Sequence, residues 1–202
     1  MNKTMKRGKF DFIPDTCLCE SPENLEVLEQ VITLAVEIAR EGREGKKIGT
    51  IFTVLNADEV ISRSRCMILD PLAYHNEALK SIEDPNLRET IKELAQLDGA
   101  FIVDKKGIVL SACRYLDVTV EDILLPLGLG SRHMAAASIS KQANCVAVAV
   151  SESSIVRIFI DGKMVSEIIP EIWLLERYSI HLEGPYSKRN CNDMTVLDKE
   201  SV

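Results

Sequence analysis

The stretch "LGLGSRHMAAASIS", residues 127–140, places an Arg-His pair where an alanine-rich helix is expected to begin. Alanine has the highest helix propensity, so the run predicts a helix over 131–142. The amino end of a helix carries partial positive charge and N–H groups without intrahelical partners. A cation at Arg132 is therefore unfavourable unless an anion lies opposite. The stretch predicts that an anion such as a phosphate binds at Gly130–Ser131.

Apolar runs of strand length and stripes with helical spacing alternate along the rest of the chain. Hydrophobic period and turn residues predict strands within residues 46–55, 65–70, 98–116, 145–152 and 155–165, with hairpins at 98–116 and 155–165. Cap residues and proline predict helices that begin at Pro22, Pro85, Thr119, Ser131 and Pro170. Interleaved strands and helices predict an α/β layered fold with a central mixed β-sheet flanked by helices.

The expected domain organisation is simple. Residues 1–20 are polar and irregular and are expected to form an N-terminal arm. Residues 21–180 are expected to form one domain, and residues 181–202 a polar C-terminal tail. A chain of 202 residues is long enough for one full hydrophobic core, and it contains no internal repeat.

The composition argues against nucleic acid and membrane partners. The net charge is −7 and aromatic residues make up 5% of the chain, whereas DNA binding needs a basic face and single-stranded nucleic acid needs aromatic stacking surfaces. No apolar run approaches the roughly 20 residues that span a bilayer, and the amino terminus lacks the apolar core of a signal peptide. Scattered cysteines indicate a reducing, cytoplasmic location. A zinc site formed by Cys17, Cys19, His181 and Cys191 is conceivable, but no C-x-x-C pair supports it.

A second unusual position is Asp98, which lies between a predicted helix end and a predicted strand start. Asp-Gly is common in such turns, so a purely structural role is the simpler reading. Yet ligands in open α/β sheets bind at strand ends, where Asp98 and the Arg132-His133 pair could bracket a metal-bound phosphate. His133 alone could equally be a surface or capping residue, and Ser151-Glu152 could be an ordinary polar strand end. The residues themselves predict an anion or nucleotide site built from Asp98, Arg132 and His133.

Three segments taken together resemble the diadenylate cyclase domain family. They are "LDGAFIV" (97–103), "GSRHMAA" (130–136) and "VAVAVSE" (146–152). The family pairs a D-G-A motif with a G-[TS]-R-H-R-x-A motif, and the resemblance extends from about residue 25 to 170. It is specific because both motifs occur in the family's order and spacing. The chain looks like a soluble stand-alone member of the archaeal type, with neither membrane helices nor a DNA-binding module.

The resemblance implies that two ATP molecules become cyclic di-AMP and two pyrophosphates, with Mg²⁺ or Mn²⁺ as cofactor. It also implies self-association, because two subunits face each other and each holds one ATP. Asp98 would bind the metal and help activate the 3′-hydroxyl, with Arg132 and His133 as the other catalytic residues. The nucleotide would contact Gly99, Ala100, Leu116, Gly130, Ser131, Arg132, His133, Ser151 and Glu152.

One position departs from the family motif: Met134 stands where many members have a second arginine. Either the site lacks the phosphate-binding charge of that arginine, or another residue such as Arg157 or Lys141 supplies it. Two other functions remain open on the residues alone. One is a catalytically weak nucleotide-binding module that regulates a partner. The other is a metal-dependent phosphohydrolase, which usually carries more clustered acidic or histidine ligands.

Overall fold

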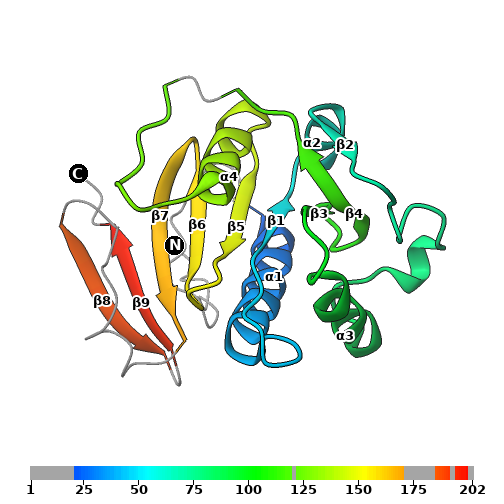
Figure 1. Cartoon of the computed structure of the whole chain (residues 1–202), viewed down its shortest axis with the longest axis horizontal. Helices are drawn as coiled ribbons and strands as arrows, with labels where there is room; N and C mark the ends of the chain where they lie inside the picture. Colours follow the sequence, from blue (N-terminus) through cyan, green and yellow to red (C-terminus); the bar gives the residue numbers. More distant parts are fainter. Residues whose placement is uncertain (1–20, 120–121, 171–184, 192–193, 200–202) are drawn as a thin grey trace, which may run out of the picture.

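The protein forms one nine-stranded sheet with helices on both faces (Figure 1). The computed structural model describes residues 21–119, 122–170, 185–191 and 194–199. Along the sheet the strand order is β2-β4-β3-β1-β5-β6-β7-β9-β8. Neighbours β1 and β3 are parallel and all the other neighbouring pairs are antiparallel, so the predicted mixed sheet is confirmed.

Most of the elements lie within the segments that the sequence analysis predicted, but helix α2 and the turn η2 were not predicted. The strands are β1 (Thr50–Val54), β2 (Ser64–Cys66), β3 (Ala100–Val103), β4 (Val109–Leu116), β5 (Val146–Val150), β6 (Val156–Ile160), β7 (Lys163–Ile169), β8 (Tyr186–Cys191) and β9 (Met194–Lys199). The helices are α1 (Pro22–Glu41), α2 (Ala57–Ser62), the 3-10 turn η2 (Glu77–Leu79), α3 (Pro85–Leu94) and α4 (Ser131–Gln142).

Two hydrophobic clusters lie on opposite faces of the sheet. Helices α1 and α3 supply one cluster, whereas α2 and α4 supply the other. In Figure 1, α4 lies in front of β5 and β6, and α1 lies behind the sheet. None of the described helices is long and apolar enough to cross a membrane.

Strand β5, "VAVAV", explains why α4 can approach the sheet closely. Its residues alternate between the two faces, as in any strand. The three valines point toward the α1 cluster, and the two alanines, Ala147 and Ala149, point toward α4. On α4 the facing residues are also small, with Ala136 and Ala137 fully buried. Small side chains on both elements remove the steric limit to close packing.

The local signals for caps and turns act as predicted. The side chain of Ser21 accepts a hydrogen bond from the backbone N–H of Asn24, and Asp84 caps α3 through Asn86 in the same way. Asp161 and Gly162 between β6 and β7 have φ of 49° and 76°. Two consecutive positive φ angles are the requirement of the tight two-residue hairpin turn.

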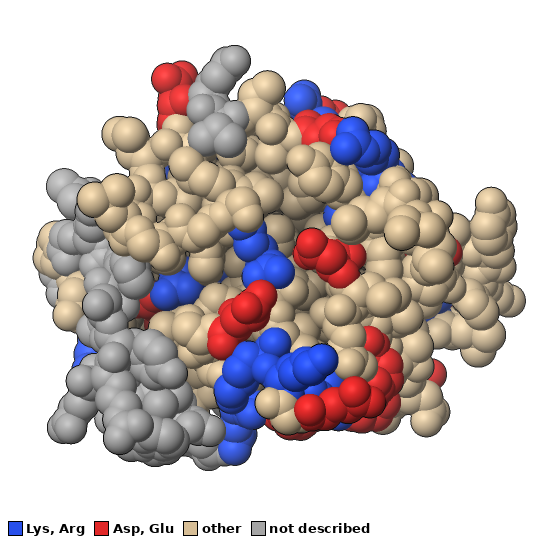
Figure 2. All heavy atoms as spheres, viewed as in Figure 1, with Lys and Arg blue, Asp and Glu red and all other residues tan. Residues whose placement is uncertain are grey.

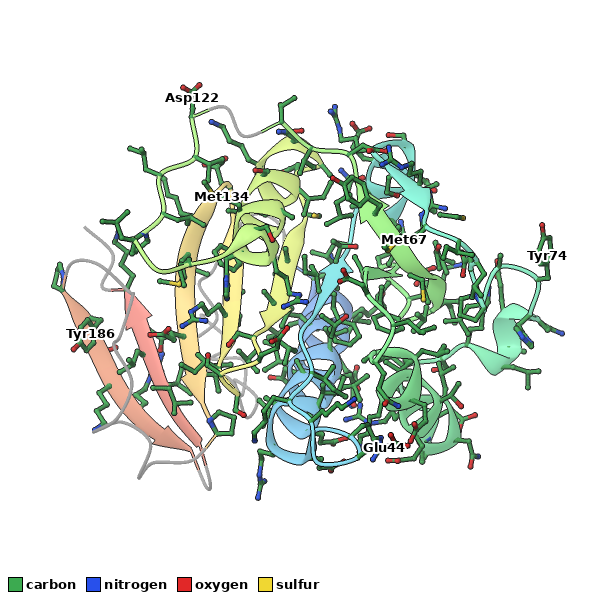
Figure 3. All side chains as sticks on the ribbon, in the orientation of Figure 1. Glu44, Met67, Tyr74, Asp122, Met134 and Tyr186 are labelled. Carbon is green, nitrogen blue, oxygen red and sulfur yellow. The ribbon has the colours of Figure 1, made fainter. Side chains whose placement is uncertain are left out.

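Two predicted strands are shorter than expected. Strand β1 begins only at Thr50, because its neighbour β5 ends opposite at Val150 and residues 46–49 have no ladder partner. Strand β2 ends at Cys66, so Met67 already lies outside it (Figure 3). Opposite this end, Cys113 of β4 has a φ of 54°, which interrupts the regular ladder.

The short helix predicted over residues 119–126 is not present among the described residues of that segment. Asp122 has a φ of 55° and lies in an extended loop at the rim of the molecule (Figure 3). A left-handed residue cannot continue a right-handed helix. Leu124 is also almost fully exposed, so no packing is available to stabilise a single turn. The closing helix predicted at 170–178 falls on residues outside the described part of the chain.

The polar tail expected over residues 181–202 is corrected for residues 186–191 and 194–199. Strands β8 and β9 form a hairpin there, and β9 pairs with β7 to extend the sheet. Val196 and Leu197 are fully buried, one in each hydrophobic cluster. Two adjacent apolar residues on opposite faces are what a sheet strand covered on both sides requires.

A buried chain of polar contacts fastens α4 to the sheet. Glu167 of β7 accepts a hydrogen bond from Nε of Arg157 of β6, with 2.7 Å between the atoms. A second guanidinium nitrogen of Arg157 lies 2.9 Å from Nε2 of His133, in the first turn of α4. Because the guanidinium group can only donate, His133 must accept through Nε2 and is therefore neutral. Burial lowers the pKa of Arg157, and the nearby charge of Glu167 partly offsets this by raising it. An arginine nevertheless stays charged at neutral pH.

We predict that Leu197→Ala lowers the free energy of unfolding by about 2–5 kcal/mol, the usual cost of removing a buried leucine side chain. Lys199→Ala, two residues further on the same strand and exposed, serves as the control and should change stability by less than about 0.5 kcal/mol. Urea denaturation followed by circular dichroism measures both. Equal stability of Leu197→Ala and the unaltered protein would show that the terminal hairpin is not part of the folded core.

The buried ion pair gives a second prediction. Glu167→Gln leaves the charge of Arg157 buried without a counter-charge, which should cost about 3–5 kcal/mol of stability. The double variant Arg157→Met, Glu167→Met removes both charges and should be more stable than Glu167→Gln. Denaturant melts of the single and double variants test this. A double variant no more stable than the single one would mean that the pair is not energetically coupled.

Candidate active site

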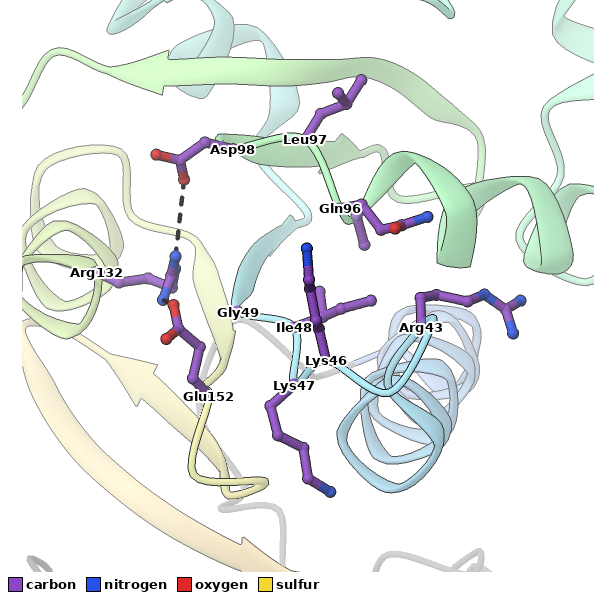
Figure 4. Close-up of a pocket in the computed structure, with 11 residues that line it drawn as sticks. Arg43, Lys46, Lys47, Ile48, Gly49, Gln96, Leu97, Asp98, Arg132 and Glu152 are labelled. Carbon is purple, nitrogen blue, oxygen red and sulfur yellow. Dashed lines mark ion pairs between the residues drawn. The ribbon is translucent and has the colours of Figure 1, made fainter.

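An open pocket of about 360 Å³ lies at one edge of the sheet (Figure 4). The parallel strands β1 and β3 both begin here, with Ile51 opposite Ala100. The antiparallel strand β5 ends at the same edge, because Val150 pairs with Thr50. Helix α4 contributes its first turn. Four segments that are far apart in sequence therefore meet at this pocket.

Three charged side chains cross the pocket in a row (Figure 4). One guanidinium nitrogen of Arg132 lies 3.7 Å from Oδ1 of Asp98, and another lies 3.5 Å from Oε1 of Glu152. Both carboxylates are largely exposed, and Arg132 is about a quarter exposed. These distances exceed those of good hydrogen bonds, so Arg132 is shared loosely between the two acids. The structure thus brings together three of the residues that the sequence analysis selected.

Gly49, which the sequence analysis did not select, makes room for Arg132. A Cβ atom at position 49 would collide with the guanidinium group of Arg132. A glycine in an otherwise apolar strand run often marks the close approach of another group, so "KKIGTIFTVL" did contain this signal. A side chain at position 49 would move Arg132 away from Asp98 and Glu152.

Gly99 is required by the backbone itself. Its φ is 113°, and a Cβ atom would come within 2.8–2.9 Å of the backbone of Cys113 and Arg114. Its N–H donates to Oδ1 of Asp98 across 2.9 Å, which holds the carboxylate at the start of β3. Gly99 therefore has a structural reason to be glycine, whether or not a ligand approaches it. Ala100 follows as the first residue of β3 and is buried in the α4 cluster.

His133 does not reach the pocket. Its side chain is 8% exposed and points into the core, where Nε2 contacts Arg157 and the ring lies 6.3 Å from that of Phe159. The reason is helical geometry: each residue turns the helix by about 100°, so Arg132 and His133 cannot face the same side. His133 is therefore not part of the pocket lining, and its predicted contact with phosphate stays a prediction.

The other selected residues lie around the pocket rather than in its lining. Gly130 is the N-cap residue of α4, with extended backbone and open space where its side chain would be, and Ser131 is exposed beside it. Ser151 is buried, and its hydroxyl is 2.6 Å from that of Ser153. Leu116 ends β4, whose antiparallel pairing with β3 brings it to the same edge of the sheet.

The two residues suggested as replacements for the missing arginine do not line the pocket. Arg157 is 2% exposed and held by Glu167 and His133. Lys141 belongs to the last turn of α4, about 13 Å along the helix axis from Arg132. Met134 itself is partly buried and packs on the α4 hydrophobic cluster (Figure 3).

Three basic residues that the sequence analysis overlooked do line the pocket. Arg43, Lys46 and Lys47 form its wall on the α1 side. Basic and acidic side chains alternate around the centre of this face and do not form a patch of one sign (Figure 2). This mixed pattern fits a small ligand that carries both phosphate and a cation better than it fits a long polyanion.

The donor set of the pocket fits a hard divalent cation shared with a ligand. Asp98 and Glu152 offer carboxylate oxygens, the ligands that Mg²⁺ prefers, and both are exposed to the pocket. Within the described residues, no group of three or more His, Cys, Asp or Glu side chains is arranged to hold a metal ion by itself. Magnesium commonly takes one or two carboxylates plus substrate phosphates, and that arrangement matches this pocket. Of the conceivable zinc ligands, Cys17, Cys19 and His181 lie outside the described part of the chain.

Comparisons with known proteins agree with the geometry. The family model described as "DisA bacterial checkpoint controller nucleotide-binding" matches residues 37–164. A protein named diadenylate cyclase from Methanocaldococcus jannaschii is 51% identical over 149 residues, which are 73% of this chain and 47% of that protein. Another of the same name from Haloferax volcanii is 36% identical over 177 residues, covering 86% of this chain and 62% of that protein.

The chain therefore spans about half to three fifths of the length of these curated relatives. Among solved structures, a hypothetical membrane spanning protein from Bacillus cereus aligns with a TM-score of 0.51 at 18% identity, over 69% of this chain and 62% of that one. At this identity the likeness concerns the fold alone. The family match covers the strands and the helix that build the pocket, and the chain belongs to the DisA nucleotide-binding (DAC) domain family.

Proposed function

We propose that this protein is a diadenylate cyclase that condenses two ATP molecules into cyclic di-AMP and two pyrophosphates. The observation that carries the proposal is the convergence of Asp98, Arg132 and Glu152 on one pocket, from three separate segments. These segments are the ones that match the family motifs. The named relatives support the same activity.

Arg132 and the start of α4 form the phosphate-binding part of the proposed site. The first N–H groups of a helix have no intrahelical partners and attract anions. Gly130 leaves open space in front of them, and Ser131 adds a hydroxyl. Arg132 can bind phosphate oxygens in a bidentate manner, which orients the triphosphate as well as attracting it.

Asp98 and Glu152 would hold Mg²⁺ or Mn²⁺ together with the triphosphate. The bound cation would neutralise phosphate charge and stabilise the departing pyrophosphate. The carboxylates also reduce the net positive charge of the pocket, so release of the anionic product is not prevented. Gly99 holds Asp98 in place through its N–H.

Each condensation step forms one bond and breaks one bond. The 3′-oxygen of one ATP bonds to the α-phosphorus of the other, the bond from that phosphorus to the oxygen bridging to the β-phosphate breaks, and pyrophosphate leaves with that oxygen. The 3′-hydroxyl loses its proton to solvent water in the step. Asp98, an exposed carboxylate at the mouth of the pocket, is the group proposed to orient this hydroxyl. Ala100 and Leu116, at the same edge, are proposed to border the adenine.

The reaction needs two sites, yet this chain contains one D-G-A and one G-S-R-H motif. Two copies of the chain must therefore face each other, each presenting one ATP to the other. The pocket is open at the sheet edge, which permits such an approach. A face-to-face pair would have two-fold symmetry, the commonest symmetry of homo-oligomers.

The proposal predicts that incubation with ATP and Mg²⁺ or Mn²⁺ yields cyclic di-AMP, and that Asp98→Asn lowers the rate by about 10²–10³. An amide binds a hard cation much more weakly than a carboxylate does. Chromatography of the products measures both. Asp58→Asn, an exposed position on α2, is the matched control and should keep the full rate.

Other products would select the other functions. ADP and phosphate would indicate a phosphohydrolase, and unchanged ATP that nevertheless binds would indicate a nucleotide-binding regulatory module. Near-normal turnover by Asp98→Asn, with cyclic di-AMP as product, would show that Asp98 does not hold the cation.

The two-copy mechanism predicts a dependence on protein concentration. Specific activity at saturating ATP and metal should fall when the protein concentration is lowered below the dissociation constant of the dimer. A single copy holds one ATP and has no second ATP opposite it whose 3′-hydroxyl could attack. Enzyme assays over a dilution series, with sedimentation or mass photometry on the same samples, measure this. Undiminished specific activity in samples shown to contain only monomers would refute the two-copy mechanism.

A further inference from the structure

Arg132 and its two acidic neighbours do not by themselves balance the charge of a triphosphate. Arg132 faces two carboxylates, so these three residues together carry a net negative charge. A triphosphate adds several more negative charges. Since Met134 packs on the α4 cluster and Arg157 is paired in the core, neither relieves this repulsion. Charge balance calls for a further cation within the pocket.

A tight turn after α1 fixes the backbone of Lys46. Its N–H donates to the carbonyl of Arg43 across 2.8 Å, and its carbonyl accepts from the N–H of Arg43 across 3.0 Å. Gly42 closes the turn with a φ of 59°, and a Cβ atom there would collide with the carbonyl oxygen of Lys46. This tight turn after α1 fixes where the lysine side chain starts.

The side chain of Lys46 rises into the pocket between Arg132 and Gln96, whereas Lys47 points in the opposite direction (Figure 4). Arg43, the third basic residue of this wall, forms ion pairs of 2.9 Å with Glu89 and with Glu93. Lys46 forms no ion pair or side-chain hydrogen bond with the described residues, and it is exposed. It differs from Arg43 because it is exposed and unpaired, and from Lys47 because its side chain points into the pocket.

We propose that Lys46 binds the terminal phosphates of the nucleotide and supplies the positive charge that Met134 does not. The inference rests on the proposed function for its ligand, a nucleoside triphosphate. Lysine acts on phosphate as a point charge at the end of a flexible stem, so it can follow the β- and γ-phosphates as the leaving pyrophosphate departs. Arginine at Arg132 orients the phosphate chain, and Lys46 balances its charge.

The alternative role for Lys46 is purely local. A cation near the carboxyl end of α1 is stabilised by the helix dipole whether or not a ligand binds. In that role Lys46 affects only the stability of the fold, so its removal would change the affinity for all nucleotides equally or not at all. Affinity for nucleotides of different phosphate number therefore separates the two roles.

The test is calorimetric titration with 3′-deoxy-ATP and with 3′-deoxy-AMP, in the presence of Mg²⁺. Both lack the attacking hydroxyl, so no turnover occurs. Lys46→Ala should weaken 3′-deoxy-ATP binding about tenfold, the loss of one charge-assisted contact, and leave 3′-deoxy-AMP binding within about twofold. Lys46→Arg should retain most of the affinity. Lys106→Ala, in the β3–β4 turn at the opposite end of β3 from Asp98, makes the same change in net charge and should bind both nucleotides normally.

The outcomes separate this inference from the proposed function. Equal weakening of both nucleotides, or no weakening of either, would overturn the role of Lys46 whatever the reaction product is. Selective loss of triphosphate affinity supports it even if the unaltered protein makes no cyclic di-AMP, in which case the proposed function fails instead. Absence of any triphosphate binding by the unaltered protein would overturn both.

Discussion

The site depends on the buried contact between Glu167, Arg157 and His133. It joins β7, β6 and the first turn of α4, so the orientation of that helix about its own axis is fixed at its amino end. The close packing of small residues between α4 and β5 allows sliding, because alanine surfaces offer few features that interlock. The buried polar contact is directional, so it fixes the position of α4 on the sheet. Its net contribution to stability is modest.

Once His133 points inward, the positions of its neighbours follow from the helical turn. Arg132 is rotated toward the pocket, and Met134 is rotated toward the apolar cluster beside the sheet. An arginine at position 134 would have to extend its long side chain around the helix to reach phosphate. A methionine there packs without that cost. The departure from the family motif is therefore compatible with a site whose second cation comes from a different element.

The sequence predicted most elements that local signals govern, apart from the helix expected at 119–126, and missed those that tertiary pairing governs. Caps, the Asp161-Gly162 turn and helix 131–142 are encoded within a few residues of themselves, so they were correct. Strand β9 was missed because Val196 and Leu197 become strand residues only when β7 lies beside them.

For the site, the sequence motifs identified Asp98, Arg132 and Glu152. They could not show that His133 turns away or that residues 46–49, before β1, enter the pocket, because side-chain direction is set by packing.

The loose geometry of Arg132 suits a site that must exchange partners. Its contacts with Asp98 and Glu152, at 3.7 and 3.5 Å and partly exposed, are weak ion pairs that cost little to break. In the proposed reaction, an incoming triphosphate competes with both carboxylates for the guanidinium group. Each carboxylate that Arg132 leaves becomes available to a cation, and each cation bound there makes the pocket more attractive to phosphate. Phosphate and cation binding are then reciprocally coupled through one side chain. Gly49 makes this exchange possible, because only a residue without a side chain leaves the guanidinium group room to sit between the acids.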